Sequence, residues 1–260
     1  MIPFFNLRTM CCAILTALVC ASLPVAVSAA GWVDEQQHGI FVFRSDFPLR
    51  DATEVVADLG ELQKDIEATL DIRCQSKPIE IYLFRNRWAY TSYVRKHVPD
   101  GDGRQALFVA GNDVGRVYAY RRPELDTDLR HETTHALLHN ALPYVPLWLD
   151  EGLAEYFENP AVLRVDGNAH ARNLALALRL GGKMNLAELE AKRKLTEMGG
   201  PEYREAWGWV HFLLHGPPEA RAVLDEFLTT IPTGREPTPL SISLRRRIPD
   251  VDRRIVEHLR

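Results

Sequence analysis

Residues 130–139 read RHETTHALLH. On a helix, residues four apart share a face, so His131 and His135 can direct two imidazole nitrogens at one point. Glu132 lies one residue along from His131, beside that point rather than on it, which is the position that a general base needs. The stretch therefore predicts a helix that holds a metal ion through two histidines, with a base next to the ion.

A second stretch, WLDEGLAEY at residues 148–156, follows after a proline-containing turn. Two imidazoles, one carboxylate and one open position make a catalytic zinc site. Glu151 and Glu155 are four apart, so both face the same way on a second helix. One can bind Zn²⁺ while the other accepts a hydrogen bond from the outer nitrogen of a ligating histidine. Asp150 points about 100° away from Glu151 and is expected at the helix start, near the positive end of the dipole.

The third histidine of the first stretch is not expected to bind the same ion. His139 lies eight residues after His131, which corresponds to a rotation of about 80° and a climb of roughly 12 Å. The pair of histidines alone is a weak signal, and its ordinary alternative is a solvated helical face. A predicted amphipathic helix, a strand just before it and an acid-bearing helix just after it favour the metal site.

Residues 130–157 resemble the gluzincin metallopeptidases, and most closely the small bacterial proteins of that clan. The resemblance implies zinc-dependent hydrolysis of peptide bonds, with Glu151 as third ligand and Glu155 as the acid that supports His131. The spacing between His135 and Glu151 is shorter than in larger gluzincins, whose count Glu155 would fit. The local Glu-Gly-x-Ala sequence favours Glu151, because loop lengths vary more easily than helix faces.

An enzyme of this kind also needs a donor for the oxyanion that forms when water attacks the peptide bond. Tyr203, Tyr156, His211 and His215 are the possible donors. Tyr203 is chosen because residues 203–214 resemble the tyrosine-bearing helix of the small relatives; its alternative role is to pack, with Trp207, against the metal helix. His211 and His215 could form a second metal site, but a pair on a helix surface is expected.

The first half of the chain predicts a sheet with helices on it. Strands are expected at residues 39–44, 78–84, 106–109 and 116–120, and helices at 51–70 and 88–97. Residues 117–120 are expected to form an edge strand, which can bind an extended peptide by backbone pairing.

From residue 125 onward the pattern is helical. Helices are expected at about 126–140, 147–158, 170–180, 186–194, 202–215, 217–229 and 249–259. The fold class is therefore α+β and zincin-like, with a small mixed sheet and N-terminal helices followed by a mostly helical half. We expect a sheet subdomain at 31–124, a helical subdomain with the zinc site at 125–230, and a linker with a C-terminal helix at 231–260.

The amino-acid composition limits the kinds of binding partner that are expected. The chain has 260 residues, of which 46% are hydrophobic, and a formal net charge of −4. These values are ordinary for a globular protein with a sizeable core. Because there is no broad basic surface, nucleic acid is not an expected partner.

Residues 1–30 are expected to be a signal peptide. Arg8 is their one charged residue, and an apolar run leads to small residues at 27–30. The protein is then exported to the periplasm or secreted, without a membrane span after cleavage; an uncleaved segment would anchor it instead. Cleavage leaves Cys74 as the one cysteine, so stability must come from the core and the metal rather than from an internal disulfide.

The favoured function is an exported zinc-dependent peptidase that acts on peptide or protein substrates. An endopeptidase is preferred, because no Gly-x-Met-Glu-Asn segment that would hold a substrate amine precedes His131. The first alternative is a zincin-like binding or scaffold protein of the cell envelope, in which the metal serves stability. The second is a hydrolase for a non-peptide amide. The sequence indicates neither the particular substrate nor the oligomeric state.

Overall fold

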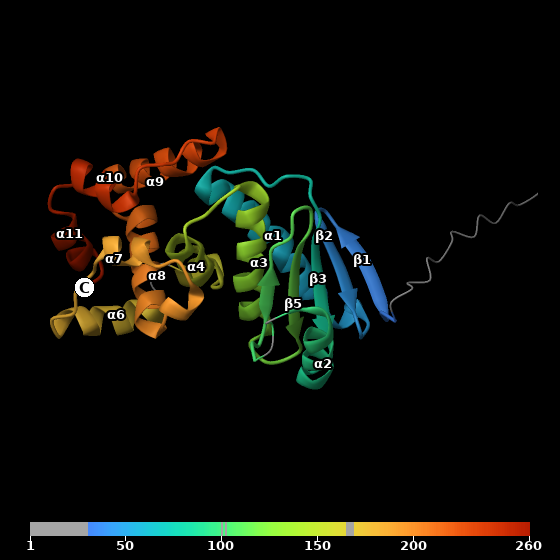
Figure 1. Ribbon diagram of the computed structural model, residues 1–260. Helices are drawn as coiled ribbons and strands as arrows, with labels where there is room; N and C mark the ends of the chain where they lie inside the picture. Colours follow the sequence, from blue (N-terminus) through green and yellow to red (C-terminus); the bar gives the residue numbers. More distant parts are fainter. Residues whose placement is uncertain (1–30, 100, 102, 165–168) are drawn as a thin grey trace, which may run out of the picture. The chain divides into compact units, whose positions relative to one another are not determined.

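The computed structural model describes residues 31–99, 101, 103–164 and 169–260. The expected signal peptide, residues 1–30, lies outside this range. Residues 31–260 form one compact unit. Its first half carries one five-stranded mixed sheet with helices, and its second half is helical (Figure 1). The predicted α+β class, with a small mixed sheet followed by a helical half, is confirmed.

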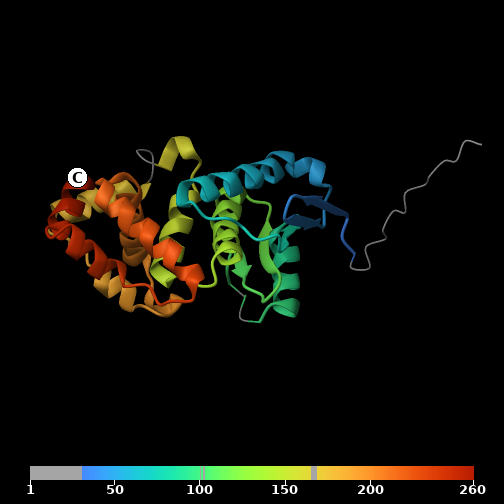
Figure 2. The same ribbon diagram turned by 90° about the horizontal axis from the view of Figure 1, so that it is seen from above.

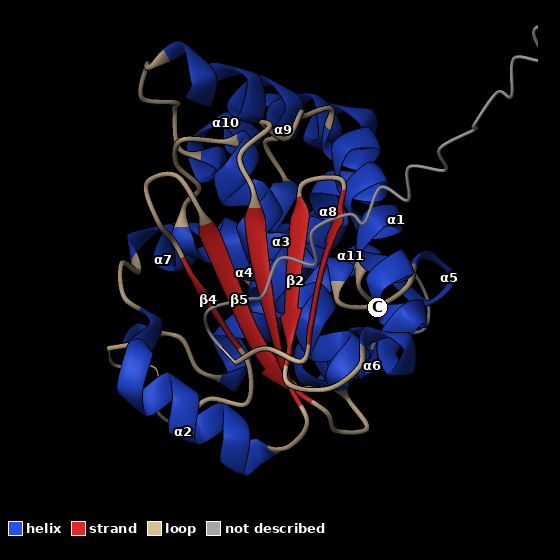
Figure 3. Ribbon diagram, turned by 90° about the vertical axis from the view of Figure 1, so that its right-hand side faces the viewer, coloured by secondary structure: helices blue, strands red, loops and turns tan. Residues whose placement is uncertain are grey.

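The sheet has the strand order β1-β2-β3-β5-β4 (Figure 3). The strands are β1 (Asp34–His38), β2 (Phe41–Ser45), β3 (Ile79–Phe84), β4 (Leu107–Val109) and β5 (Gly115–Tyr120). β2, β3 and β5 run parallel, while β1 and β4 pair antiparallel at the two edges. The helices α1 (Thr53–Leu70) and α2 (Arg87–His97) lie in the connections between the parallel strands, as parallel pairing requires.

Two expectations for the strands are wrong or incomplete. β5 does not form an edge, because it lies between β3 and β4; the edge strand on this side is β4. β1 was not predicted, since its sequence is polar and shows no apolar alternation. It pairs with β2 through the backbone, and most of its side chains remain exposed. Side-chain patterning cannot reveal a strand of this kind.

Alternation along the central strands explains how both faces of the sheet are covered. In β3, Ile79, Ile81 and Leu83 point to the face that packs on α1 and on α3 (Leu125–Ala141). Tyr82 and Phe84 point to the opposite face, which α2 covers (Figure 1). Successive side chains of a strand point to opposite faces, so a strand that is buried on both sides is apolar throughout.

The helical half begins at α4 (Leu147–Phe157), which packs between α3 and α8 (Gly200–His215). The other helices are α5 (Ala161–Arg164), α6 (Ala169–Arg179), α7 (Leu186–Ala191), α9 (Pro218–Thr230), α10 (Leu240–Arg247) and α11 (Val251–His258). Figure 2 shows the orange and red C-terminal helices on the far side of α3 from the sheet. The short helices α5 and α10 were not predicted. Among the described helices, none is long and apolar enough to cross a membrane.

Cys74 is half-buried, and its Sγ lies 3.7 Å from the carbonyl oxygen of Leu137. Burial raises the pKa of this thiol to about 12, and the negative charge of Glu67 acts in the same direction. Thiol nucleophiles need a pKa near or below neutral pH. Cys74 therefore packs against α3, and its thiol lacks the lowered pKa of a nucleophile.

Gly152 allows α4 and α8 to approach closely. A Cβ at this position would lie 2.8 Å from the carbonyl oxygen of Ala206 and 2.9 Å from a methyl carbon of Val210. We expect Gly152→Ala to lower the free energy of unfolding by about 1–3 kcal/mol, measured by urea denaturation, because overpacking forces the helices apart.

Gly60 is the matched control for this prediction. It also lies within a helix, α1, but a Cβ there would have no neighbour within 4 Å. Gly60→Ala is expected to stabilise the protein by about 0.5–1 kcal/mol, because alanine has less backbone entropy to lose. Equal effects of the two substitutions would contradict the close contact between α4 and α8.

Candidate metal centre

The helix α3 is buried on most of its surface. Leu129, Thr133, Thr134 and Leu137 are all fully buried, so polar threonines and leucines alike face other parts of the protein. Leu129, Ala136 and Leu137 are buried as expected, but the helix is less amphipathic than predicted, because its polar threonines are buried as well. It is held between the sheet, α1 and α4. His131, Glu132 and His135 of this buried helix line a cavity of about 650 Å³.

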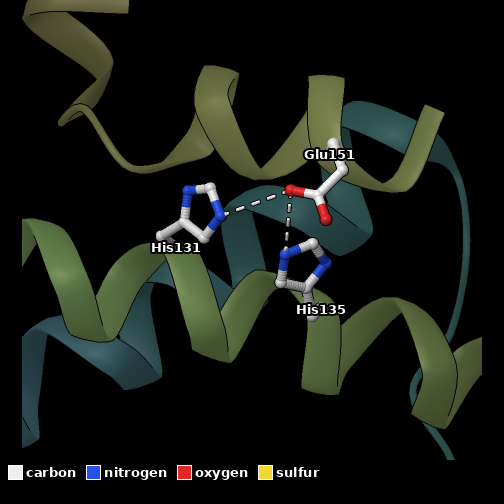
Figure 4. A group of neighbouring side chains, drawn as sticks. All are labelled: His131, His135 and Glu151. Carbon is white, nitrogen blue, oxygen red and sulfur yellow. Dashed lines mark ion pairs between the residues drawn. The ribbon is translucent and has the colours of Figure 1, made fainter. Parts of the chain in front are cut away.

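Three side chains from two helices point toward one another (Figure 4). The Nε2 atom of His131 lies 3.7 Å from Oε2 of Glu151, and Nε2 of His135 lies 3.6 Å from the same oxygen. His135 is 7% exposed and Glu151 is 5% exposed. The potential ligand atoms of the three residues all lie within 4.8 Å of one another.

This donor set fits Zn²⁺. Tetrahedral ligands that are each about 2.0–2.2 Å from zinc lie roughly 3.3–3.6 Å apart. The two nitrogen–oxygen distances, 3.6 and 3.7 Å, are close to that separation. Two imidazoles and one carboxylate also leave a fourth position for water or substrate, which distinguishes catalytic sites from closed structural ones.

Each histidine is oriented by an acid at its other ring nitrogen. Nδ1 of His131 lies 3.0 Å from Oε2 of Glu158, and Nδ1 of His135 lies 3.0 Å from Oδ1 of Asp150. The second oxygen of Asp150 lies 3.1 Å from Nε2 of His139. The contact between His131 and Glu158 is a hydrogen bond, and an acceptor at Nδ1 fixes the tautomer that leaves Nε2 available for a metal. The contact between His135 and Asp150 is an ion pair that lacks hydrogen-bond geometry.

The sequence-based interpretation missed these outer partners. Glu155 was expected to support His131, but its carboxylate lies 2.6 Å from Nε2 of His170. The carboxylate bonded to His131 is that of Glu158, which follows the last residue of α4 in a helical conformation. Glu158 is seven residues after Glu151, so two turns bring it back to the same face. This spacing is the signal that could have identified it.

Asp150 also has more contacts than expected. It lies in the first turn of α4, as predicted, and its carboxylate also reaches α3. It is the shared partner of His135 and His139. Burial acts to raise the pKa of Asp150, but the two histidines lower it well below its usual range. His139 therefore takes part in the outer layer of the site through Asp150, rather than as a ligand.

The electrostatics of the site favour a positive charge. Burial alone would lower the pKa of His131, but hydrogen bonds to Glu151 and Glu158 outweigh it and raise the pKa well above the usual value. Burial raises the pKa of Glu158, and repulsion from Glu155 adds to this. Several carboxylates thus surround two imidazoles. Their negative charge favours the binding of a cation at this place, either a proton on a histidine or a metal ion.

The cavity brings the predicted base and the predicted donor together with the ligands. Its lining includes Glu132 from α3, Tyr203 from the first turns of α8, and Phe108 from the edge strand β4. The ring of Phe108 stacks on that of His135, with centroids 6.3 Å apart. Burial, together with the negative charges of Glu151 and Glu155, raises the pKa of Tyr203 to about 12. Its hydroxyl therefore keeps its proton across the physiological range.

The other possible oxyanion donors are placed elsewhere. The hydroxyl of Tyr156 lies 2.7 Å from Nε2 of His215. His211 is buried, and its Nδ1 lies 2.8 Å from Nε2 of His258. None of the three, Tyr156, His211 or His215, lines the cavity. The expectation that His211 and His215 form a surface pair is wrong for His211, which is buried against His258 of α11, whereas His215 is exposed.

The structure thus gathers five of the six predicted site residues around one cavity: His131, Glu132, His135, Glu151 and Tyr203. The sixth, Glu155, lies outside the lining and is bonded to His170. No protein-family model and no curated protein matches the chain. What the protein does therefore has to be argued from the chemistry of these residues.

Proposed function

We propose that the chain is an exported zinc-dependent peptidase of the gluzincin type, acting as an endopeptidase on peptide or protein substrates. One observation carries the proposal: Nε2 atoms of two histidines lie 3.7 and 3.6 Å from a single carboxylate oxygen, inside a cavity that also contains a base and a hydroxyl donor. A structural zinc site requires neither a base nor a hydroxyl donor beside its ligands.

Zinc held by His131, His135 and Glu151 would acidify an attacking water and polarise the carbonyl of the scissile bond. Glu132 lines the cavity but does not belong to the group of ligand atoms. Its carboxylate is therefore available to accept a proton from the attacking water and to donate it to the leaving amine. The Tyr203 hydroxyl donates a hydrogen bond to the carbonyl oxygen as that oxygen gains negative charge.

The edge strand β4 can hold a peptide substrate by backbone pairing. It pairs with β5 on one side, and Phe108 in its middle contacts the cavity. An extended peptide that pairs with the other side of β4 would pass the metal ligands with its backbone groups satisfied. Recognition of this kind uses the main chain, which suits a peptide substrate better than a non-peptide amide.

The proposal is tested with the purified chain, residues 31–260, loaded with Zn²⁺. We expect one zinc per chain by elemental analysis, cleavage within a mixed peptide library by mass spectrometry, and loss of cleavage with 1,10-phenanthroline that added zinc reverses. Zinc binding and unfolding on chelation, without cleavage of any peptide, would refute the peptidase and indicate the scaffold role.

Tyr203→Phe is expected to lower kcat by about 100-fold or more, because one donor to the oxyanion is lost. Since the pKa of Tyr203 is about 12, its hydroxyl is protonated at pH 6 and at pH 10 alike. The loss should therefore be the same factor across this range. The measurement is the pH profile of kcat for both proteins.

Tyr144→Phe serves as the control, because Tyr144 is half-exposed between α3 and α4 and does not line the cavity. Its kcat should equal that of the unchanged protein. If Tyr203→Phe folds normally and keeps its full kcat, Tyr203 is a packing residue and the oxyanion donor lies elsewhere.

A further inference from the structure

The cavity at the metal centre contains one basic side chain that the proposed chemistry does not use. Among its described lining residues, Arg104 is the single lysine or arginine. The acids of the lining are Asp128, Glu132, Asp150, Glu151 and Glu158. An arginine in this lining either pairs with a neighbouring acid or is available to bind a ligand. The contacts of Arg104 and of the five acids distinguish these two roles.

Three of the acids in the lining have other partners. Asp128 lies 3.3 Å from Nε of Arg122, Asp150 contacts two histidines, and Glu158 contacts His131. Arg104 is exposed, and within the described part of the chain no carboxylate lies within ion-pair distance of its guanidinium. Its charge opposes the effect of burial on the pKa of Tyr203, so its field reaches the proposed oxyanion donor.

The residues that follow Arg104 are held by contacts with the sheet and its surroundings. The neighbouring Gln105 accepts hydrogen bonds at Oε1 from the hydroxyl of Tyr120, at 3.1 Å, and from Arg122. Ala106, which follows it, is buried, and β4 begins at Leu107. Arg104 therefore stands three residues before the first residue of the edge strand, on the cavity side. A peptide lying along β4 would pass this guanidinium.

We propose that Arg104 binds a carboxylate of the substrate, so that the peptides taken by this site carry a negative charge near the bond that is cut. The inference rests on the proposed function and names its substrate class. Guanidinium groups pair with carboxylates through two parallel hydrogen bonds, which fixes position as well as charge. The carboxylate is an aspartate or glutamate side chain if the enzyme is an endopeptidase, as proposed above; a carboxylate at the end of the peptide chain would make it a carboxypeptidase. The two sources can be separated by experiment.

The test measures binding to zinc-loaded Glu132→Gln protein, which should hold peptides without cutting them. The probes are fluorescein-labelled decapeptides of alanine and leucine in which one glutamate is moved through the sequence, each made with a free and with an amidated C-terminus. Matching peptides carry glutamine in place of glutamate. Fluorescence anisotropy gives the dissociation constants at low and at high salt.

We expect at least one glutamate position, or the free C-terminus, to improve binding by about 5- to 10-fold, as for a partly exposed charged hydrogen bond. The difference should shrink at high salt. Arg104→Ala should abolish it, and Arg104→Glu should reverse it, so that the glutamine peptide binds more tightly than the glutamate peptide. Arg235→Ala is the control, since Arg235 is exposed and does not line the cavity, and it should keep the preference.

Equal binding of acidic and neutral peptides, or a preference that survives Arg104→Ala, would overturn the inference. Cleavage of the same peptides by the protein with Glu132 intact separates the two proposals. Cleavage without any preference for acid would retain the peptidase and reject the role of Arg104. An Arg104-dependent preference in binding, without any cleavage, would retain the anion site and reject the peptidase.

Discussion

Glu132→Gln is expected to lower kcat for peptide hydrolysis by about 10²–10⁴-fold while the protein still binds one zinc ion. General acid–base catalysis contributes a factor of this size, and glutamine has the shape of glutamate without its basicity. Zinc binding should persist because Glu132 is not among the ligand atoms that lie within 4.8 Å of one another. The measurements are kcat on the best peptide of the library and zinc content by elemental analysis.

Glu54→Gln is the matched control, because Glu54 is an exposed acid in the first turn of α1, away from the cavity. It should leave kcat unchanged. Full activity of Glu132→Gln would show that another group takes the proton from the attacking water. Loss of both activity and zinc would mean that Glu132 binds the metal, which contradicts the division between ligands and base proposed above.

The second large effect is expected at the third ligand. Glu151→Gln should weaken zinc binding by more than about 100-fold, because even partners outside the ligand set cost 10- to 100-fold. Glu151 is 5% exposed and one of its carboxylate oxygens lies near Nε2 of both histidines, so the substitution changes the group that the two histidines share. Competition with a zinc-chelating dye gives the affinity.

Two neighbouring glutamates make this prediction specific. Glu158→Gln should weaken zinc binding by about 10- to 100-fold, since it leaves Nδ1 of His131 without its acceptor carboxylate. Glu155→Gln should weaken it least, because Glu155 is bonded to His170. If Glu155→Gln removes zinc as completely as Glu151→Gln does, the set of ligands is wrong.

The central part of the site was predictable because it depends on one helix at a time. His131 and His135 share a face through helical spacing alone, and the same rule places Glu151 and Glu155 on one face of a second helix. The choice of Glu151 between these two came from the resemblance of its Glu-Gly-x-Ala sequence to the gluzincins. The outer contacts depend instead on how α3 crosses α4. That crossing decides that Asp150 reaches His135 and that Glu158, rather than Glu155, reaches His131.

The fold shows the same division between local and long-range information. The strands β2, β3 and β5 and the helix α1 have apolar residues at regular spacing, and all four were predicted. Sheet order was not, because the position of β4 outside β5 is set by a long-range pairing. Burial of His211 likewise follows from the way later helices fold over α8, which its own sequence does not indicate.

The zinc site itself is tested most directly by a crystal structure of the zinc-loaded protein with data collected on both sides of the zinc absorption edge. We expect a single strong anomalous peak about 2.0–2.2 Å from Nε2 of His131, Nε2 of His135 and a carboxylate oxygen of Glu151. A peak between His131, Glu155 and Glu158, which form the other group of potential ligands, would contradict the site described here. So would the absence of any bound zinc.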